Sequence, residues 1–428
     1  NSCDAWVDPG LYNMNVQAGA PPDDFAVKGQ NWGFPTYNWE VMALDNFKWW
    51  RRRFEQMARY FDAFRIDHIL GFFRIWNIPI ESVQGIMGIF NPALPIHVYE
   101  FAQRGMWFNY YRFCKPYITD AVLWELFGPN KEKFFPFLVS TGNHSYALPD
   151  VYSTQRKIEK YFCELEQNTE NNNIRDGLYE LISNVILFEE KDSNGQQFHF
   201  RISMPDTTSF RHLDWNIQQQ LKAMYDDYFY RRQDGFWKKE AMKKLPSLKR
   251  ATNMLICGED LGMVPHCVPQ VMKLLGILSL EIQRMPKEET KLFFNPNDAP
   301  YLSVVTPSTH DMSTIRSWWE ENRDTTQRFF NQELEQAGEA PKTCDAWVNK
   351  AIVLQHLNSP AIWSIFQLQD IMGIDEFIRC PNHLSERINI PAIVHHYWRY
   401  RMHMNLEELL KEKEFNDELK QFVEASGR

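Results

Sequence analysis

The chain has 428 residues, of which 44% are apolar and 24% are charged, the composition of a soluble globular protein with room for two or three domains. Its formal net charge of −9 and the lack of a long basic run argue against a nucleic acid as the main ligand. No apolar stretch approaches the ~20 residues of a membrane helix, so no membrane partner is expected.

The seven cysteines are scattered, odd in number and without a Cys-x-x-Cys pair. This usage favours free thiols in a reducing compartment, and with the lack of a signal-peptide pattern it predicts a cytoplasmic, that is cytosolic, protein. The sequence begins at Asn1, inside a predicted loop, so we expect an upstream part of the protein to precede it.

The first 45 residues are rich in Pro, Gly, Asn and Asp and are predicted to form long loops. A helix is predicted over 44–61, followed by a strand over 63–68 and then the segment 72–79. From about 85 to 250 the pattern changes to helices mixed with loops. Helices are predicted near 98–113, 154–167, 173–184 and 214–245, and a strand pair at 185–188 and 197–204.

After residue 250 strands and helices alternate regularly. Strands are predicted at 254–257, 278–282, 302–305 and 362–368, and helices at 268–275, 312–321 and 347–356, with Gly276 as a helix stop signal. This alternation is typical of an α/β fold with a parallel sheet or barrel.

Three carboxylates follow apolar strands of this pattern, and their spacing indicates an insertion. Glu259 and Asp311 are 52 residues apart, which suits two strand–helix units. Asp67 and Glu259 are 192 residues apart, far more than one unit of roughly 30 residues. We therefore predict a barrel part over 1–84, an inserted subdomain over 85–250 and the C-terminal half of the barrel over 251–428. About five barrel strands are visible and a closed barrel needs about eight, so the others would lie upstream of Asn1.

The three carboxylates suggest glycosyl chemistry. Retaining glycosyl transfer needs one carboxylate as nucleophile and a second, protonated carboxyl as acid and then base. Asp67 suits the nucleophile because Arg65, two residues earlier on the same face, favours its ionised form. Glu259 suits the acid/base because its apolar setting raises its pKa. Asp311 could hold sugar hydroxyls and steady the transition state, with hydroxyl donors at His68 and His310.

Each motif also has an ordinary structural interpretation. An Asp-His pair is commonly a helix cap or a surface hydrogen bond, and Glu259-Asp260 could open the next helix, where acidic residues are favoured. Three such motifs, each at the end of an apolar strand, favour a site.

These residues resemble the 4-alpha-glucanotransferases of glycoside hydrolase family 77, the amylomaltases and disproportionating enzymes. The matching segments are Gly19–Asp23, Gly29–Pro35, Arg65–His68, Gly258–Gly262, Thr309–Asp311 and Glu386–Pro391. The long insertion after Asp67, together with residues 29–39, resembles the cytosolic type-2 disproportionating enzymes of plants and some protists. In one departure, Ala392 follows Pro391 where the family usually has glycine.

The resemblance implies a (β/α)8 TIM-type barrel with a large, mostly helical insertion. Asp67 would be the nucleophile, Glu259 the acid/base and Asp311 the transition-state stabiliser. The substrate-binding residues implied or predicted are Arg65, His68, His310, Gln30, Trp32, Asp23, Arg387 and Asn389. Gln30 and Trp32 would belong to a flexible loop that covers the donor and helps to exclude water, and Asp23 would lie at its root. For Trp32, a buried loop anchor is the alternative.

The implied function is 4-alpha-glucanotransferase activity by retaining double displacement. Glucosyl units would pass from maltose or malto-oligosaccharides to glycogen, a soluble heteroglycan or another branched alpha-glucan, and glucose would be released. The alternatives are an alpha-glucan hydrolase of the amylase type and a non-catalytic glucan-binding protein. No cofactor is expected, because the sequence has no Gly-rich loop of the kind that binds phosphate. No metal is expected, because the adjacent His395 and His396 point in different directions. Homo-oligomer formation stays open.

Overall fold

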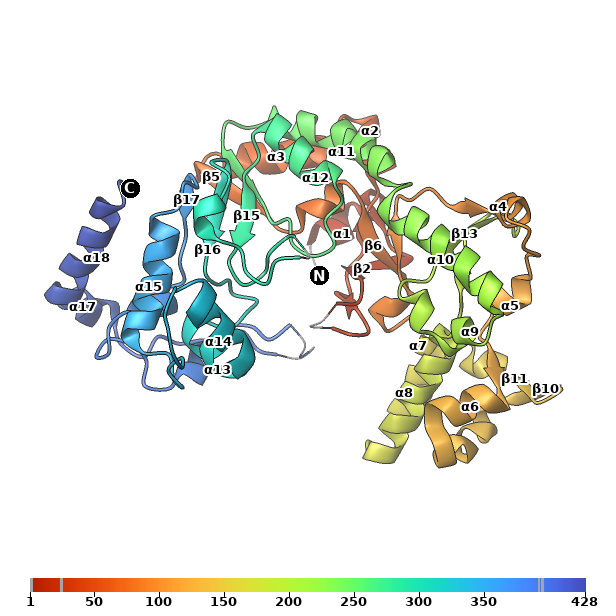
Figure 1. Cartoon of the computed structure of the whole chain (residues 1–428). Coiled ribbons are helices and arrows are strands. Elements are labelled where there is room, and N and C mark those ends of the chain that lie inside the picture. The colour runs from red at the N-terminus through yellow and green to blue at the C-terminus, as the bar shows by residue number, and fades with distance from the viewer. Residues whose placement is uncertain (1–2, 24–25, 289, 392, 394–395) are drawn as a thin grey trace. The chain divides into compact units, whose positions relative to one another are not determined.

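The computed structural model describes residues 3–23, 26–288, 290–391, 393 and 396–428. The chain divides into two compact units (Figure 1). The first comprises Asn1–Arg59, Leu70–Thr252 and Pro265–Val268, and the second comprises Tyr60–Ile69, Asn253–Val264 and Pro269–Arg428. In the described ranges no helix is long and apolar enough to cross a membrane.

The second unit is built on a run of parallel strands. These are β5 (Ala63–Ile66), β14 (Leu255–Gly258), β15 (Ser279–Ile282), β16 (Ser303–Thr306) and β17 (Trp363–Ser364). β14 pairs with β5, and β16 pairs with both β15 and β17. A parallel bridge between Cys257 and Leu278 joins β14 to β15, and Gly258 N–H donates to the Leu278 carbonyl at 2.8 Å. The strand order is therefore β5-β14-β15-β16-β17.

This run confirms the mixed α/β class and the parallel sheet predicted from the alternating pattern. As far as the structure describes the chain, the run is open at β5 and at β17, so the closed barrel and the upstream strands stay predictions. The prediction for the last strand was too long: only Trp363 and Ser364 pair with β16, and a helix begins at Leu368.

Helices follow the strands of the second unit. They are α12 (Cys267–Leu275), α13 (Ile315–Glu321), α14 (Arg323–Gln332), α15 (Ala346–Leu357), α16 (Leu368–Met372), α17 (Leu406–Leu409) and α18 (Lys413–Ala425). α12 ends as predicted at Gly276, whose φ of 61° allows Ile277 N–H to reach the Met272 carbonyl at 2.9 Å. A buried cluster that includes Trp319, Phe329 and Val348 joins α13, α14 and α15.

The N-terminal part of the first unit contradicts the prediction of long loops. An antiparallel sheet in the order β3-β2-β6-β7 combines β2 (Val16–Ala20) and β3 (Gln30–Asn31) with β6 (Ile75–Pro79) and β7 (Ile89–Asn91). A second pair is formed by β1 (Tyr12–Asn13) and β4 (Thr36–Tyr37), flanked by the helices α1 (Cys3–Val7) and α2 (Trp39–Leu44). These strands are short and their main partner β6 is distant in sequence, so the local turn residues hid them.

The predicted helix over 44–61 was also wrong in extent. Within this range only α3 (Lys48–Met57) forms a full helix, because Asn46 and Phe47, which separate it from α2, have φ of 58° and 56°, outside the helical region. α3 buries Trp50 and Phe54, which lie four residues apart on one helix face.

Residues after β7 form a largely helical region. Its helices are α4 (Val98–Gln103), α5 (Tyr110–Cys114), α6 (Asp120–Phe127), α7 (Gln155–Cys163), α8 (Thr169–Ser183), α9 (Thr208–Arg211), α10 (Trp215–Tyr230) and α11 (Asp234–Lys249). Its strands are β8 (Ile96–His97), β9 (Ile118–Thr119), β10 (Val139–Gly142), β11 (Ser145–Ala147), β12 (Leu187–Glu189) and β13 (Gln197–Phe200).

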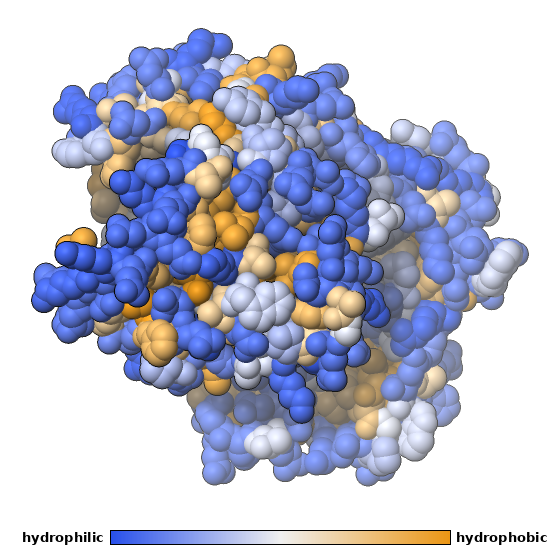
Figure 2. Space-filling view, turned by 60° about the vertical axis from the view of Figure 1, so that its left-hand side comes forward, coloured by the Kyte–Doolittle hydropathy of each residue, from blue (hydrophilic) through white to orange (hydrophobic). Residues whose placement is uncertain are grey.

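The predicted strand pair is confirmed, because β12 and β13 pair in antiparallel register. Two predicted helices are each divided in two: 98–113 is α4 and α5, and 214–245 is α10 and α11 with a break after Tyr230. The core between α6, α7 and α8 contains Val122, Ile158 and Leu178, each with 0% exposure. The boundaries proposed at 84/85 and 250/251 stay predictions. The molecular face in Figure 2 is largely hydrophilic, with apolar side chains gathered in small patches.

Candidate active site

Strand pairing brings Asp67 and Glu259 to the same edge of the parallel sheet. Ile66 of β5 is in register with Gly258 of β14, so Asp67 and Glu259 are the next residue on each strand. Both therefore follow the carboxyl ends of neighbouring parallel strands, where the strands of α/β enzymes present reactive groups. The backbone continues the pairing, because Glu259 N–H donates to the Ile66 carbonyl at 2.9 Å.

The Glu259 carboxylate is partly buried and fixed by backbone donors. His68 N–H donates to Oε2 at 2.9 Å and Leu261 N–H donates to Oε1 at 2.8 Å. Burial, assisted by the nearby negative charge of Asp67, raises the pKa of Glu259 to about 6, although the two N–H donors and Arg65 act in the opposite direction. A carboxyl with this pKa can hold a proton close to neutral pH and release it, as a general acid must.

Asp67 has a contrasting environment. Its side chain is 80% exposed, and the Arg65 guanidinium donates to Oδ1 at 2.5 Å. The next residue, His68, has a φ of 47°, an uncommon left-handed conformation for a non-glycine residue. In this conformation the His68 N–H donates to Glu259, while the preceding residue carries the exposed Asp67 carboxylate. A strained backbone residue therefore links the two carboxyl groups.

A buried charge cluster supports the strand that carries Glu259, and the sequence reasoning missed it. Asp260 is fully buried; its Oδ1 accepts from Leu280 N–H at 3.0 Å and its Oδ2 accepts from Lys287 Nζ at 2.8 Å. Lys287 also donates to Glu281 at 2.9 Å. Asp260 thus does not open a helix but ties the end of β14 to β15. The one sequence signal for Asp260 is its position directly after Glu259. The sequence around Lys287 carries no signal for this cluster.

Asp311 follows β16 and is held by side chains. Asn389 Nδ2 donates to Oδ1 at 2.8 Å, and His310 Nε2 lies 3.0 Å from Oδ2. The Asp311 side chain is 44% exposed. The His310 ring lies 5.3 Å from the exposed ring of Trp398, a neighbour that the sequence reasoning missed.

Arg387 fixes the segment that carries Asn389. Its Nε donates to the Asn389 carbonyl at 3.0 Å, and its guanidinium lies 3.5 Å from Glu321. The structure therefore brings Asp311, His310 and Asn389 into direct contact. Arg387 acts on them through Asn389.

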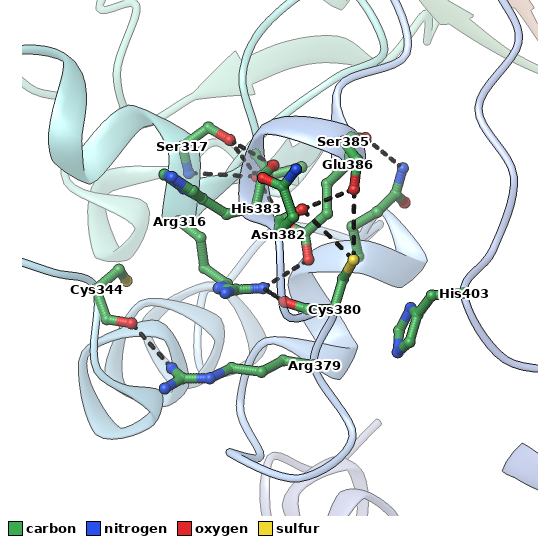
Figure 3. Close-up of polar contacts among 12 residues, drawn as sticks. Arg316, Ser317, Cys344, Arg379, Cys380, Asn382, His383, Ser385, Glu386 and His403 are labelled. Atoms are coloured by element: carbon green, nitrogen blue, oxygen red, sulfur yellow. Dashed lines mark hydrogen bonds and ion pairs between the residues drawn. The ribbon is translucent and has the colours of Figure 1, made fainter.

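A buried ion pair between Arg316 and Glu386 anchors this segment (Figure 3). Arg316 of α13 donates to Glu386 at 2.7 Å and to the Cys380 carbonyl at 2.8 Å. Glu386 is 1% exposed, and Thr314 donates to its second oxygen at 3.2 Å. Burial raises the pKa of Glu386, against the lowering effect of Arg316. Because Glu386 precedes Arg387 and Asn389, the pair fixes the base of the segment that reaches Asp311.

The three remaining predicted binding residues lie in the first unit. Trp32 Nε1 donates to Gln30 Oε1 at 3.1 Å, and the Trp32 ring stacks on Phe34 with 5.8 Å between centroids. Trp32 is partly buried and Phe34 is exposed. Asp23 accepts from Ala26 N–H at 2.7 Å and so closes a turn before this segment.

Among the described residues no group of three or more His, Cys, Asp or Glu side chains has an arrangement that could hold a metal ion. All seven cysteines are free thiols. The sequence features at Ala392 and His395 lie outside the described residues.

Comparison with known proteins gives the family. The model of glycoside hydrolase family 77, described as 4-alpha-glucanotransferase, matches residues 1–407. The chain therefore belongs to the 4-alpha-glucanotransferase family. It is 40% identical to the 4-alpha-glucanotransferase DPE2 of Oryza sativa subsp. japonica, a match that covers 100% of this chain and 46% of the relative. It is 22% identical to the 4-alpha-glucanotransferase of Chlamydia pneumoniae over 97% of this chain and 52% of the relative.

The chain spans about half the length of these relatives. A solved structure, the amylomaltase from Streptococcus agalactiae in complex with acarbose, matches with a TM-score of 0.55 and 15% identity, over 100% of this chain and 55% of that one. This likeness concerns the fold.

Proposed function

We propose that the protein is a 4-alpha-glucanotransferase that works by retaining double displacement, with Asp67 as nucleophile and Glu259 as acid/base. The observation that carries the proposal is the contrast between two carboxyl groups at the ends of paired strands. Glu259 is partly buried with a pKa raised to about 6, whereas Asp67 is exposed and paired with Arg65. Neighbouring carboxyls with such different environments divide the acid and nucleophile roles of glycosidic bond cleavage.

In the first step the Asp67 carboxylate attacks the anomeric carbon of the donor. The bond from that carbon to the glycosidic oxygen breaks, and the Glu259 proton passes to the departing oxygen. In the second step Glu259, now ionised, takes the proton from an acceptor hydroxyl as its oxygen displaces Asp67 from the anomeric carbon. The protein returns to its initial protonation state, and the configuration at the anomeric carbon is retained.

The other site residues bind and orient the sugar in this proposal. Asp311 stabilises the oxocarbenium-like transition state, in an orientation maintained by Asn389 and His310. Arg65 and His68 contact the same sugar, and Arg387 fixes Asn389. Asp23, Gln30 and Trp32 form the covering loop, defined as residues 23–34, which binds the donor and excludes water from the covalent intermediate.

The proposed donor is maltose or a malto-oligosaccharide, and the acceptor is glycogen or another branched alpha-glucan. The resemblance to DPE2 supports this pair, and the acarbose complex of the streptococcal amylomaltase makes acarbose a suitable probe of binding. We also propose that the parallel strands belong to a (β/α)8 barrel with an insertion over 85–250, and that the protein works in the cytosol, where free thiols persist.

A test of the function supplies labelled glucose as acceptor together with maltose. Label should enter oligosaccharides without net loss of glycosidic bonds, and dominant release of reducing ends without incorporation would show a hydrolase instead. Asp67→Asn should lower transfer by at least about 10³-fold while acarbose still binds. Asp176→Asn is a matched control, because Asp176 is also exposed and paired with an arginine, Arg175. Undiminished turnover in Asp67→Asn would reject the assignment.

A further inference from the structure

A turn between β6 and β7 connects the covering loop to the inserted helices within the first unit. This turn, residues 83–87, is held by one side chain of α7. Gln155 Oε1 accepts from both Val83 N–H and Gln84 N–H at 2.9 Å, and its Nε2 donates to Gln84 Oε1 at 3.0 Å. Gln155 itself is 1% exposed, and the three bonds that it makes to the turn are partly buried.

The opposite side of the same turn holds the covering loop. Ile86 N–H donates to the Lys28 carbonyl at 2.7 Å, and Asn31 Nδ2 donates to the Val83 carbonyl at 3.0 Å. The backbones approach so closely that a Cβ on Gly85 would lie 2.6 Å from Gln30 N, a contact that only glycine allows. The turn therefore fixes the backbone at Gln30, and Gln30 in turn accepts from Trp32 Nε1.

The side chains of the turn also belong to the inserted region. Val83 and Met87 pack against the core of α6, α7 and α8. At the surface, Lys28 of the covering loop forms an ion pair with Glu180 of α8. Polar and apolar contacts thus connect the inserted helices to the turn 83–87, and one ion pair connects them directly to Lys28.

We propose that Gln155 is a positioning residue that holds the covering loop in place through the turn 83–87. This inference rests on the proposed function and deepens it, because it gives the inserted region a role: to keep Gln30 and Trp32 in the arrangement that excludes water from the covalent intermediate. Without Gln155, two partly buried N–H groups lose their acceptor, the turn loosens, and the loop opens more often. Water then competes better with the acceptor sugar.

The test compares two glutamine variants in the full-length protein. Gln155→Met removes the acceptor with little change in side-chain volume. Gln233→Met is the matched control: Gln233 is also 1% exposed and also bonds to backbone. It accepts from Leu94 N–H at 2.7 Å and donates to the Leu94 carbonyl at 2.9 Å, so its side-chain bonds go to another segment than the turn 83–87.

Two readouts are taken: hydrogen exchange of peptides that cover 28–34, and the ratio of transfer to hydrolysis with maltose as donor. In Gln155→Met we expect exchange at 28–34 to accelerate and the transfer-to-hydrolysis ratio to fall, each by roughly tenfold. Gln233→Met should leave both near wild type. If Gln155→Met does not fold, Glu180→Gln should move both readouts in the same direction by about twofold.

Equal behaviour of the two glutamine variants would overturn the proposal, and so would faster exchange with an unchanged ratio. Hydrogen exchange does not depend on activity, so it tests the role of Gln155 separately from the proposed function. If the wild-type protein performs no transfer, the proposed function fails, and exchange at 28–34 then decides by itself whether Gln155 holds the loop.

Discussion

The two carboxyl regions of the second unit are held in different ways. Glu259 accepts from backbone N–H groups of His68 and Leu261, and the buried Asp260 beneath it ties β14 to β15. Asp311 accepts from the side chain of Asn389, which arrives from a segment 78 residues later in the chain. The arrangement at Glu259 follows from strand pairing. The arrangement at Asp311 depends on the segment that carries Asn389 and on the buried Arg316–Glu386 pair that anchors this segment.

This difference separates two kinds of control over the site. The backbone donors just after the paired strands cannot be removed by a single side-chain change, so the position of the Glu259 carboxylate is robust. The orientation of Asp311 depends on replaceable side chains, so it should be adjustable without loss of the fold. The following variants test that contrast.

The largest effect is expected from Glu259→Gln, which removes the proton that the leaving oxygen needs. Transfer from maltose should fall by about 10⁴-fold. In the wild-type protein kcat/KM should fall as pH rises above about 6, where Glu259 loses its proton, and this limb should be absent from the residual activity of the variant. Glu170→Gln, at an exposed glutamate paired with Lys133, is the control. A wild-type limb that persists in Glu259→Gln would assign the acid to another residue.

Arg316→Met should cause the largest loss of stability. It leaves the Glu386 carboxylate buried without its ion-pair partner, at a cost of about 3–5 kcal/mol in the free energy of unfolding. Denaturant unfolding measures this cost. Lys133→Met, which breaks an exposed pair, should cost far less. Equal losses in the two variants would show that the Arg316–Glu386 pair does not anchor the segment.

Glu259 should also make stability depend on pH. Its pKa is raised from 4.5 in the unfolded chain to about 6 in the folded protein, so the folded state binds the proton more tightly. The stabilisation is therefore complete below pH 4.5 and is lost as pH rises through about 6. Between pH 4 and pH 8 the wild type should lose about 2 kcal/mol of unfolding free energy relative to Glu259→Gln. Parallel pH profiles of the two proteins would contradict the raised pKa.

The smallest effect is expected from Asn389→Ala, which removes the bond from Nδ2 to Asp311. The kcat/KM for maltose should fall about tenfold because Asp311 loses its orientation, while the unfolding free energy should change by less than about 0.5 kcal/mol. Asn382→Ala is less suitable as a control, because Asn382 caps the turn at His383. Asn331→Ala, at an exposed asparagine of α14, serves instead. A loss of stability without a loss of kcat/KM would make Asn389 purely structural.

Much of the catalytic side of the second unit could be predicted from the sequence. The apolar strands before Asp67, Glu259 and Asp311 have local signals, and so does the helix end at Gly276, so the prediction of a parallel sheet was correct. The length of chain between Asp67 and Glu259 indicated an insertion, and the inserted subdomain over 85–250 stays a prediction.

The contacts that shape the site could not be predicted, because they join distant segments. Lys287 reaches Asp260 across 27 residues, and Asn389 reaches Asp311 across 78. The loop prediction for the first 45 residues was wrong for the same reason: β2 is a strand because it pairs with β6, about 60 residues later. Short strands rich in Gly and Ala show little pattern of their own.

The central claim is that Asp67 forms a covalent bond with the sugar and that Glu259 supplies and removes the proton. The most direct measurement treats the Glu259→Gln variant with alpha-glucosyl fluoride, whose leaving group needs no acid, and maps the product by peptide mass spectrometry. The account predicts that one glucosyl group accumulates as an ester on Asp67, because the variant lacks the base that would pass it to an acceptor. An unlabelled Asp67, or a label on Asp311 or another carboxylate, would contradict it.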